Sequence, residues 1–492
     1  MSSAITSHRN ALIVLAVLAV LYGLVSFPNH ALLRTYALDL GLYTHVMWHY
    51  ANGRIHDSSL FLEEAQPILA DHFDLYLPLF SPLIHITGTW TLLVLQWIAI
   101  LTGIWGVRKF LLTIELSQRM GLVGMIIAGL FYGIFAALAF DYHSNVVAAM
   151  ILPWCLFALF KGRRLLAIGL FVFMLIGKEN MGFWLGPVAL IVGFHPKMPI
   201  RSKYLSIAMG AFGLIYSSAI IGIVMPSLSQ DGMYAHFDYS LLGSSSAGLP
   251  KALIERPAEM IEALFLDHRG VSRGTDIKLE FWWMLMLSGG WALFFQPRWG
   301  LMALPLLAQK MWHDDPGKWS VIAQYGVEFA PLIGIAVPIA LSRITITKQK
   351  QMLITLAIIA GLACLIRFMD RTNAYHDRSR IRIYQAQHYV KPYPLDVVRD
   401  LLASIPPNAS ISAQSPAVPH LALRDRLYQF PIIRDAEYIV LLPLESTYPL
   451  DRSSYRSVVA EIKQQEEWRM VMETDEVLLL QRAIKRAEVA AP

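Results

Sequence analysis

Long runs of apolar residues recur along most of the chain, and each approaches the length that a helix needs to cross a bilayer. A helix of about 20 apolar residues spans roughly 30 Å of hydrocarbon. Eleven such runs occur before residue 369, several of them short, at about residues 11–27, 89–107, 121–140, 146–160, 165–176, 181–194, 204–225, 281–295, 300–311, 321–341 and 351–368. The pattern therefore predicts an all-α polytopic membrane domain of about eleven transmembrane helices.

Composition and charge support this prediction. Of the 492 residues, 55% are hydrophobic and 16% charged, so most of the chain is not a water-soluble globule. The net charge of +5 is explained by location, because Lys and Arg gather in cytoplasmic loops of membrane proteins. With a cytoplasmic N-terminus, the loops expected inside contain Arg108, Lys109, Arg119, Lys161, Arg163, Arg164, Lys197, Arg201, Lys203, Arg298, Arg343, Lys348 and Lys350. We predict a multi-pass protein of the cell (inner) membrane that binds no nucleic acid.

The loops expected outside hold a second set of ionisable residues. They contain Asp39, Asp71, His72, Asp74, Asp141, His143, Lys178, Glu179, Asp267, His268, His313, Asp314 and Asp315. Wet loops carry charge in any membrane protein, which explains many of these residues individually. Many of them lie at the very ends of apolar runs, however, where a charge is costly to desolvate unless it has a partner or a task. The set as a whole indicates a functional site on the outer face.

The first outer segment, about residues 28–88, is long enough to form helices that lie on the membrane surface. Apolar residues recur every four positions from Leu38 to Tyr50, which predicts such a helix there. Asp39 falls in its first turn, where a carboxylate interacts favourably with the helix dipole. On this pattern alone, a capping role and a catalytic role for Asp39 both stay open.

Three ionisable residues, Asp71, His72 and Asp74, precede a second apolar stretch of the same segment. On a helix, Asp71 and Asp74 would lie on one side, where two carboxylates repel unless they share a cation or a proton. A divalent cation, Mg²⁺ or Mn²⁺, held by these two carboxylates would account for the spacing. A helix N-cap at either aspartate accounts for it equally well.

Two short outer turns add further candidates. The turn FDYHSN, residues 140–145, contains His143, and the turn GKEN, residues 177–180, places Lys178 beside Glu179 between two apolar runs. Such side chains can be interfacial anchors whose polar ends reach water. They can also present a cation to the phosphate of a lipid.

The longest outer loop, about residues 226–280, contains the run LDHRGVSRG. Arg269 in this run is a candidate for binding an anionic head group. Long loops in compact proteins are often functional, for example as gates over a site, and a solvated flexible loop is the alternative.

The composition changes after residue 368, where the long apolar runs stop and the proportion of charged residues rises. We predict that a transmembrane domain, residues 1–368, is followed by a small soluble α/β domain, residues 369–492, on the outer face. The spacing of apolar residues indicates helices at residues 397–405 and 455–465, and strands at residues 410–414, 438–442, 468–472 and 477–481.

Four motifs occur in a set order: DLGLYTHVMWHYANGR, which begins at Asp39, then LADHFDLYLPLFSPL, FDYHSN and GKENMG. The ordered set resembles the bacterial and archaeal family called domain of unknown function 2079. That family is similar to the GT-C superfamily of integral-membrane glycosyltransferases, which use polyprenyl-phosphate sugar donors. The resemblance covers most of the chain. Thr44 and His45 depart from it, because such sequences often have an acid or an amide there.

The resemblance implies a GT-C-like fold and places Asp39 where these enzymes carry their catalytic carboxylate. Asp39 would then be the general base that takes a proton from the acceptor hydroxyl. Lys178, together with His72 or His143, would stabilise the leaving phosphate. The residues expected to bind substrate are Asp71, His72, His143, Lys178, Glu179 and Arg269.

A transporter or flippase of a lipid-linked or small polar substrate is the main alternative, because ionisable groups in multi-span proteins also mark transport pathways. A transporter built from repeats is expected to hold polar groups near the bilayer midplane, whereas these acids lie at the outer rim. A non-catalytic partner in envelope assembly is a third interpretation. The observation that distinguishes these interpretations is whether Asp39 is needed for activity or only for folding.

Overall fold

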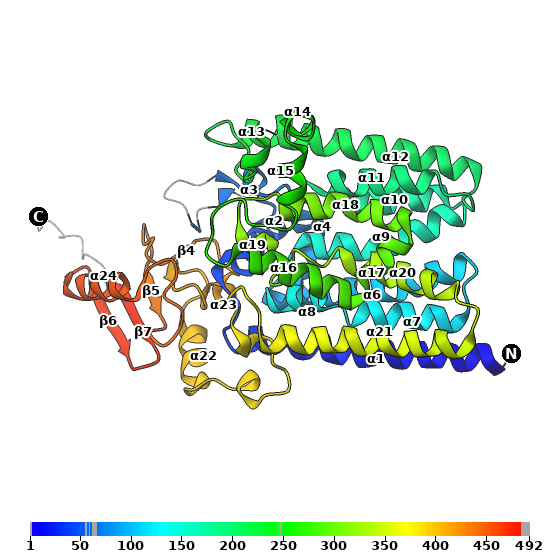
Figure 1. Ribbon diagram of the computed structural model, residues 1–492. Helices are drawn as coiled ribbons and strands as arrows, with labels where there is room; N and C mark the ends of the chain where they lie inside the picture. The colour runs from blue at the N-terminus through cyan, green and yellow to red at the C-terminus, as the bar shows by residue number, and fades with distance from the viewer. Residues whose placement is uncertain are drawn as a thin grey trace, which may run out of the picture. The chain divides into compact units, whose positions relative to one another are not determined.

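The computed structural model describes residues 2–54, 57–58, 60–61, 66–243, 245 and 248–483. Most of the described chain is helical. The helices of the membrane domain are α1 (Ser2–Ala31), α6 (Thr91–Thr113), α7 (Gln118–Gly129), α8 (Tyr132–Ala139), α9 (Ser144–Phe160), α10 (Arg164–Leu175), α11 (Met181–Gly193), α12 (Ile200–Ala219), α16 (Gly274–Leu285), α17 (Trp291–Phe295), α18 (Pro297–Met311), α20 (Phe329–Ser342) and α21 (Thr347–Asp370). Long helices such as α1, α12 and α21 run roughly parallel (Figure 1).

Each of the eleven apolar runs predicted from the sequence contains helix. Within the described ranges, four helical segments are long and apolar enough to cross a membrane, namely Thr6–Ala31, Tyr76–Thr113, Ile200–Leu228 and Thr347–Asp370. The pair α7 and α8, bent by 42°, makes a fifth if it counts as one span. Residues 321–328 are not helical as predicted, since Ala323 has a φ of 58°, which a right-handed helix cannot contain. The protein is therefore a multi-pass membrane protein with several short apolar helices.

The chain forms two compact units. The first unit comprises residues 1–27, 69–75 and 93–388, so it includes most of the long helices. Its shorter elements include α3 (Ile68–Asp71), α13 (Met225–Leu228), α14 (Leu249–Glu255), α15 (Pro257–Glu262) and α19 (Pro316–Trp319). The second unit comprises residues 28–68, 76–92 and the described part of 389–492. Residues 28–68 and 76–92, which include most of the first outer segment, therefore belong to the same compact unit as the C-terminal domain.

Glycines allow the closest helix packing in the first unit. A Cβ atom added at Gly182 of α11 would lie 1.9 Å from the carbonyl oxygen of Gly213 in α12. A Cβ atom at Gly210 of α12 would likewise lie 2.8 Å from the carbonyl oxygen of Gly186. Because the two backbones touch, no larger residue fits at these positions without moving a helix. Small residues at such contacts drive helix association in membranes, where the hydrophobic effect contributes little.

The second unit contains a mixed sheet and several short helices. Its five-stranded sheet has the order β4-β3-β5-β7-β6. The strands are β3 (Ile411–Ala413), β4 (Leu427–Gln429), β5 (Tyr438–Leu441), β6 (Trp468–Glu473) and β7 (Leu478–Arg482), and a separate pair is β1 (Asp57–Ser58) with β2 (Gln66–Pro67). The helices are α2 (Leu42–Ala51), α4 (Tyr76–Phe80), α5 (Ile84–Thr87), α22 (Leu395–Ser404), α23 (Val418–Leu421) and α24 (Arg452–Gln464).

This arrangement confirms the predicted C-terminal α/β fold. Strand β3 pairs in parallel with β4 and β5, whereas β7 pairs antiparallel with β5 and β6. Apolar side chains from the sheet and from α24 form the core, among them Ile439, Leu441, Tyr455 and Ile462. The sequence did not indicate β4, which pairs only with β3 through the tertiary fold.

Candidate functional site

Asp39 lies in a strained turn between α1 and α2. Its φ of 66° and ψ of −93° are those of a γ-turn that is rare for an L-residue, and Leu38 before it is extended. The backbone N–H of Leu42 donates to the carbonyls of Ala37 and Asp39. The surface helix therefore begins at Leu42 and not at Leu38 as predicted, because the positive φ of Asp39 interrupts it. Asp39 is half-buried and does not cap the helix from within its first turn.

Two contacts with the C-terminal part of the second unit fix this turn. The backbone N–H of Ala37 donates to the hydroxyl of Ser415 at 3.1 Å. A Cβ atom at Gly41 would lie 2.8 Å from Cγ1 of Val418, so α23 packs directly on the backbone two residues after Asp39. Ala37, Ser415 and Val418 are all buried. The conformation of Asp39 is thus imposed by residues far away in the sequence.

Several polar side chains of the second unit form hydrogen bonds, one of them from Arg34, which shortly precedes the Asp39 turn. The guanidinium of Arg34 donates to the carbonyl of Val390 at 2.8 Å. The carboxylate of Glu445 accepts hydrogen bonds from Lys391 and Tyr393. Burial, and then the Glu445 carboxylate, raise the pKa of Tyr393, so its hydroxyl stays protonated and continues to donate. The second unit therefore contains two largely buried cationic side chains, Arg34 and Lys391, and a largely buried carboxylate, Glu445.

A candidate metal centre lies in the first unit. One ligand atom each from Asp71, His72 and His236 lie within 4.8 Å of one another. His236 Nε2 is 2.8 Å from Asp71 Oδ1, and the rings of His72 and His236 stack with centroids 4.4 Å apart. Asp74, the second predicted ligand, is outside this group, because α3 ends at Asp71 and the two carboxylates do not share a helix. All three grouped side chains are partly exposed.

Glu179 holds the rest of this cluster in place. Its side chain is 1% exposed, and Oε1 lies 3.5 Å from His72 Nδ1. The hydroxyl of Tyr234 donates to Oε1 at 3.3 Å, and the backbone N–H of Phe73 donates to Oε2 at 3.2 Å. Burial raises the pKa of Glu179, but His72 and Lys178 lower it more strongly, so the group stays ionised. A carboxylate behind a histidine is the usual device that orients a metal-binding imidazole.

The charge states within the cluster suit ligand binding. Burial raises the pKa of Asp71, but the hydrogen bond from His236 and the electrostatic effect of the two neighbouring imidazoles lower it below its ordinary value. Burial, followed by the charge of Lys178, lowers the pKa of His72. A neutral imidazole and an ionised carboxylate are the forms that bind metals. The ammonium of Lys178 forms no hydrogen bond or ion pair with the described residues.

His143 belongs to a different network of the first unit. Its backbone N–H donates to Oε1 of Gln96 at 2.8 Å, and Nε2 of Gln96 donates to the carbonyl of Asp141 at 2.7 Å. The carboxylate of Asp141 forms an ion pair with Arg380 at 2.6 Å, and both residues are largely buried. This network anchors the FDYHSN turn to residues just after α21.

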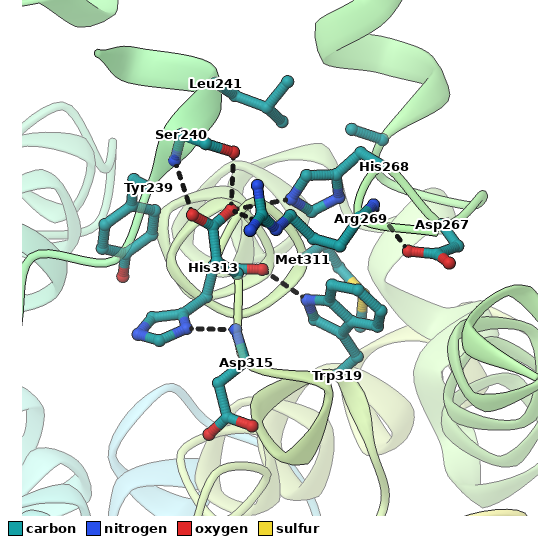
Figure 2. A network of polar contacts seen from close by, with 12 residues as sticks. Tyr239, Ser240, Leu241, Asp267, His268, Arg269, Met311, His313, Asp315 and Trp319 are labelled. Carbon is teal, nitrogen blue, oxygen red and sulfur yellow. Dashed lines mark hydrogen bonds and ion pairs between the residues drawn. The ribbon is translucent and has the colours of Figure 1, made fainter. Parts of the chain in front are cut away.

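Arg269 belongs to a network that ties the long outer loop to the loop before α19. Asp314 accepts hydrogen bonds from Ser240 N and Oγ at 2.9 and 2.8 Å, and His268 and Arg269 converge on the same carboxylate at 3.4 and 3.7 Å (Figure 2). Burial raises the pKa of Asp314, but the Ser240 hydrogen bonds lower it, followed by the charge of Arg269 and the neighbouring His268. The predicted anion-binding arginine is therefore paired with a carboxylate of its own chain.

A buried lysine fixes the tautomer of His268. Lys278 is 0% exposed, and its ammonium donates to the carbonyls of Ala263 and Met311 at 2.5 and 2.8 Å. The same ammonium is 3.0 Å from His268 Nδ1, which must accept because an ammonium only donates. The His268 proton is consequently on Nε2, the atom that faces Asp314.

Sequence reasoning missed several residues of these clusters. His236 lies in a loop without any periodic pattern, and Ser415 and Val418 lie in a domain that gave no motif. Asp314 was named among the outer-loop residues, but not as the partner of Arg269. A conserved spacing would not have revealed them, since each meets its partner only through the tertiary fold. The single signal was the concentration of His and Asp in the outer loops.

Comparison with solved structures shows which known fold the chain shares. The crystal structure of ArnT from Cupriavidus metallidurans bound to undecaprenyl phosphate matches with a TM-score of 0.53 at 10% identity, over 96% of this chain and 98% of that one. The structure of the same ArnT in the apo state matches with a TM-score of 0.52 at 10% identity, over 97% of both chains. The chain therefore shares the fold of ArnT, a mostly helical membrane domain followed by a small C-terminal mixed-sheet domain, as predicted.

The family follows from the sequence itself. Residues 29–479 match the family described as predicted membrane protein (DUF2079), so the chain belongs to that family and the resemblance seen in its motifs is confirmed. Among curated proteins, no sequence matches this one.

Proposed function

We propose that the protein is an integral-membrane glycosyltransferase that transfers a sugar from a polyprenyl-phosphate donor to an acceptor, with Asp39 as general base. The observation that carries this proposal is the Asp39 turn, a half-buried carboxylate on a strained backbone that Ser415 and Val418 fix. Such strain costs about 1–3 kcal/mol and persists where the surroundings impose it, which is typical of functional sites. The GT-C fold supports the proposal, because one structure of similar fold is bound to undecaprenyl phosphate.

The proposed reaction makes one bond and breaks one. The acceptor hydroxyl oxygen bonds to the anomeric carbon of the sugar while the bond from that carbon to the phosphate oxygen breaks. Asp39 takes the proton of the hydroxyl, and the polyprenyl phosphate leaves with the bonding electrons. The products are the glycosylated acceptor and a free polyprenyl phosphate.

Lys178 is the residue that we propose for binding the donor phosphate. Its ammonium has no protein partner among the described residues, whereas Arg269, another predicted contact, is paired with Asp314. A cation without a carboxylate partner is available to an anionic ligand at no cost in broken ion pairs. We propose that His72 and Glu179 assist Lys178 in binding the phosphate. Glu179 lies next to both Lys178 and His72 and orients the His72 imidazole.

We propose that Asp71, His72 and His236 hold a divalent cation. Two imidazoles and one carboxylate suit Zn²⁺ better than Mg²⁺ or Mn²⁺, which prefer oxygen ligands, so Zn²⁺ replaces the two ions expected from the sequence as first choice. A cation bound there would supply positive charge toward a phosphate. Glu179 behind His72 provides the second layer that such sites require.

The orientation in the membrane follows the distribution of basic loops. We propose that the N-terminus is cytoplasmic, that the Asp39 turn and the C-terminal domain are extracytoplasmic, and that transfer takes place at the outer face of the inner membrane. Accessibility labelling of single cysteines, one placed in the loop of residues 342–346 and one in β6, tests this orientation. Opposite accessibility of the two positions in sealed vesicles is the expected result.

The activity is tested with purified full-length protein in lipid nanodiscs and a panel of polyprenyl-phosphate sugars labelled in the sugar. A membrane lipid extract supplies acceptors, and the same sugars on nucleoside diphosphates are the control donors. We expect labelled product and free polyprenyl phosphate in equal amounts, from lipid donors only. Movement of the intact donor across a vesicle membrane without cleavage would instead establish a flippase, and a folded protein without either activity would favour an assembly partner.

A further inference from the structure

A cavity of about 510 Å³ opens between α17, α20 and α21, away from the outer loops described above. Its wall is mostly apolar and includes Trp291, Phe295, Leu341 and Leu353. Volumes of 300–1,000 Å³ are typical of ligand pockets, so the space is large enough for part of a lipid. Phe295 is 67% exposed, which places an aromatic ring at the edge of the cavity where an acyl chain could lie against it.

Two polar side chains line the same cavity. Gln296 is 4% exposed, and its side-chain nitrogen has no hydrogen-bond partner among the residues that the structure describes. A buried donor without an acceptor costs about 1–3 kcal/mol, which a bound acceptor would recover. Arg343 is exposed, and its guanidinium forms no hydrogen bond or ion pair within the part of the chain that the structure describes. An unpaired donor and an unpaired cation thus face one apolar cavity.

The cavity lies at the basic end of the helices. Gln296 lies in the turn between α17 and α18, next to Arg298, and Arg343 lies in the turn between α20 and α21. Burial, followed by the charges of Arg298, Lys197 and Lys203, lowers the pKa of His195 to about 4, so several basic turns gather there. Membrane proteins carry such basic clusters beside the anionic lipid head groups of the cytoplasmic leaflet.

We propose that this cavity binds an anionic phospholipid of the surrounding bilayer. The guanidinium of Arg343 and the amide of Gln296 bind the phosphodiester, and an acyl chain lies against Trp291, Phe295 and Leu353. Charge complementarity selects an anionic lipid over a zwitterionic one, because the arginine has no carboxylate to satisfy it. The site is separate from the proposed transferase site and does not depend on it.

Native mass spectrometry of the purified full-length protein tests the proposal. The protein is titrated with phosphatidylglycerol and, in parallel, with phosphatidylethanolamine of the same acyl chains. We expect phosphatidylglycerol to bind more tightly, and Arg343→Ala to weaken its binding about tenfold, the usual contribution of a charge-assisted hydrogen-bonded pair. Gln296→Leu, which keeps the volume and removes the donor, is expected to weaken it less.

Arg201→Ala is the matched control, because Arg201 is an exposed arginine at the start of α12 and does not line the cavity. Ala340→Phe fills the cavity and leaves Arg343 in place, so it is expected to reduce binding of both lipids. Arg343→Gln serves if the alanine variant does not fold. Equal loss in Arg201→Ala and Arg343→Ala, no preference for phosphatidylglycerol in the native chain, or full displacement of the lipid by inorganic phosphate would each overturn the proposal.

Discussion

The backbone N–H of Ala37 donates to the hydroxyl of Ser415, 378 positions later in the chain, at 3.1 Å. Both residues are buried, and the bond lies two residues before the strained Asp39. The small C-terminal domain therefore contributes directly to the conformation of the turn that carries the proposed base.

Replacing Ser415 by alanine removes this support. The variant leaves the N–H of Ala37 buried without an acceptor, so we expect unfolding to become easier by about 1–3 kcal/mol and sugar transfer to fall. Thermal melting in detergent and the transfer assay check both effects. Ser412→Ala is the control, since the Ser412 hydroxyl is also buried on β3 but has no hydrogen-bond partner in the described part of the chain. Equal behaviour of the two variants would show that the Ala37 bond contributes nothing.

Asp39→Gly is expected to separate stability from activity. Glycine adopts a positive φ without strain, so the folded protein should gain roughly 1 kcal/mol while transfer is lost with the carboxylate. Asp39→Asn keeps the strain and serves as the reference for thermal melting. A glycine variant that melts below the asparagine variant would show that the turn is not strained as described.

The metal centre is tested by metal content. We expect purified protein to retain Zn²⁺ after dialysis, His236→Ala to lose it, and Glu179→Gln to bind it about 10- to 100-fold more weakly, because the orienting carboxylate is gone. Elemental analysis and competition with a fluorescent zinc chelator measure this. Asp74→Asn is the control, since Asp74 is outside the grouped ligands. Loss of zinc in Asp74→Asn with retention in His236→Ala would support the pair of carboxylates predicted from the sequence instead.

Acidification should loosen the long outer loop through His268. Burial, followed by the charge of Lys278, lowers the pKa of His268 below its ordinary 6.5. Below about pH 6.5 the unfolded chain therefore takes up a proton that the folded chain resists, so stability is present above this pH and is lost as the pH falls. His313 contributes to the same loss of stability at low pH, because burial lowers its pKa to about 4.

The melting temperature between pH 7 and pH 5 measures this dependence. We expect His268→Gln to show a shallower decrease than the native chain, with the remaining slope due to other buried histidines. The exposed His85→Gln is the control and should retain the native slope. A native protein that becomes more stable on acidification would contradict the assignment.

The helices could be predicted from the sequence because their apolar runs are local patterns. The run before Phe329 shows the limit, since composition alone did not reveal the positive φ of Ala323 that keeps residues 321–328 out of the helix. Strand β4 was not predicted at all, because it forms only by pairing with β3 in the tertiary fold.

In the candidate site, too, local motifs could be recognised in the sequence, whereas contacts between distant residues could not. Asp39 could be identified from its motif, but its backbone conformation could not, because contacts with Ser415 and Val418 impose it. His236 meets Asp71 across 165 positions, so no spacing along the chain could pair them. The spacing of Asp71 and Asp74 suggested a shared cation, yet α3 ends at Asp71 and a histidine takes the place beside it.

The most direct test of the account is sugar transfer by Asp39→Asn, compared with the native chain at equal folded yield in the same nanodiscs. Asp396→Asn, an exposed aspartate in the first turn of α22, is the matched control. We predict at least about a 100-fold loss of the transfer rate in Asp39→Asn, the contribution of a general base, with an unchanged melting temperature and full activity in the control. Transfer by Asp39→Asn at the native rate would contradict the account and remove Asp39 from the mechanism.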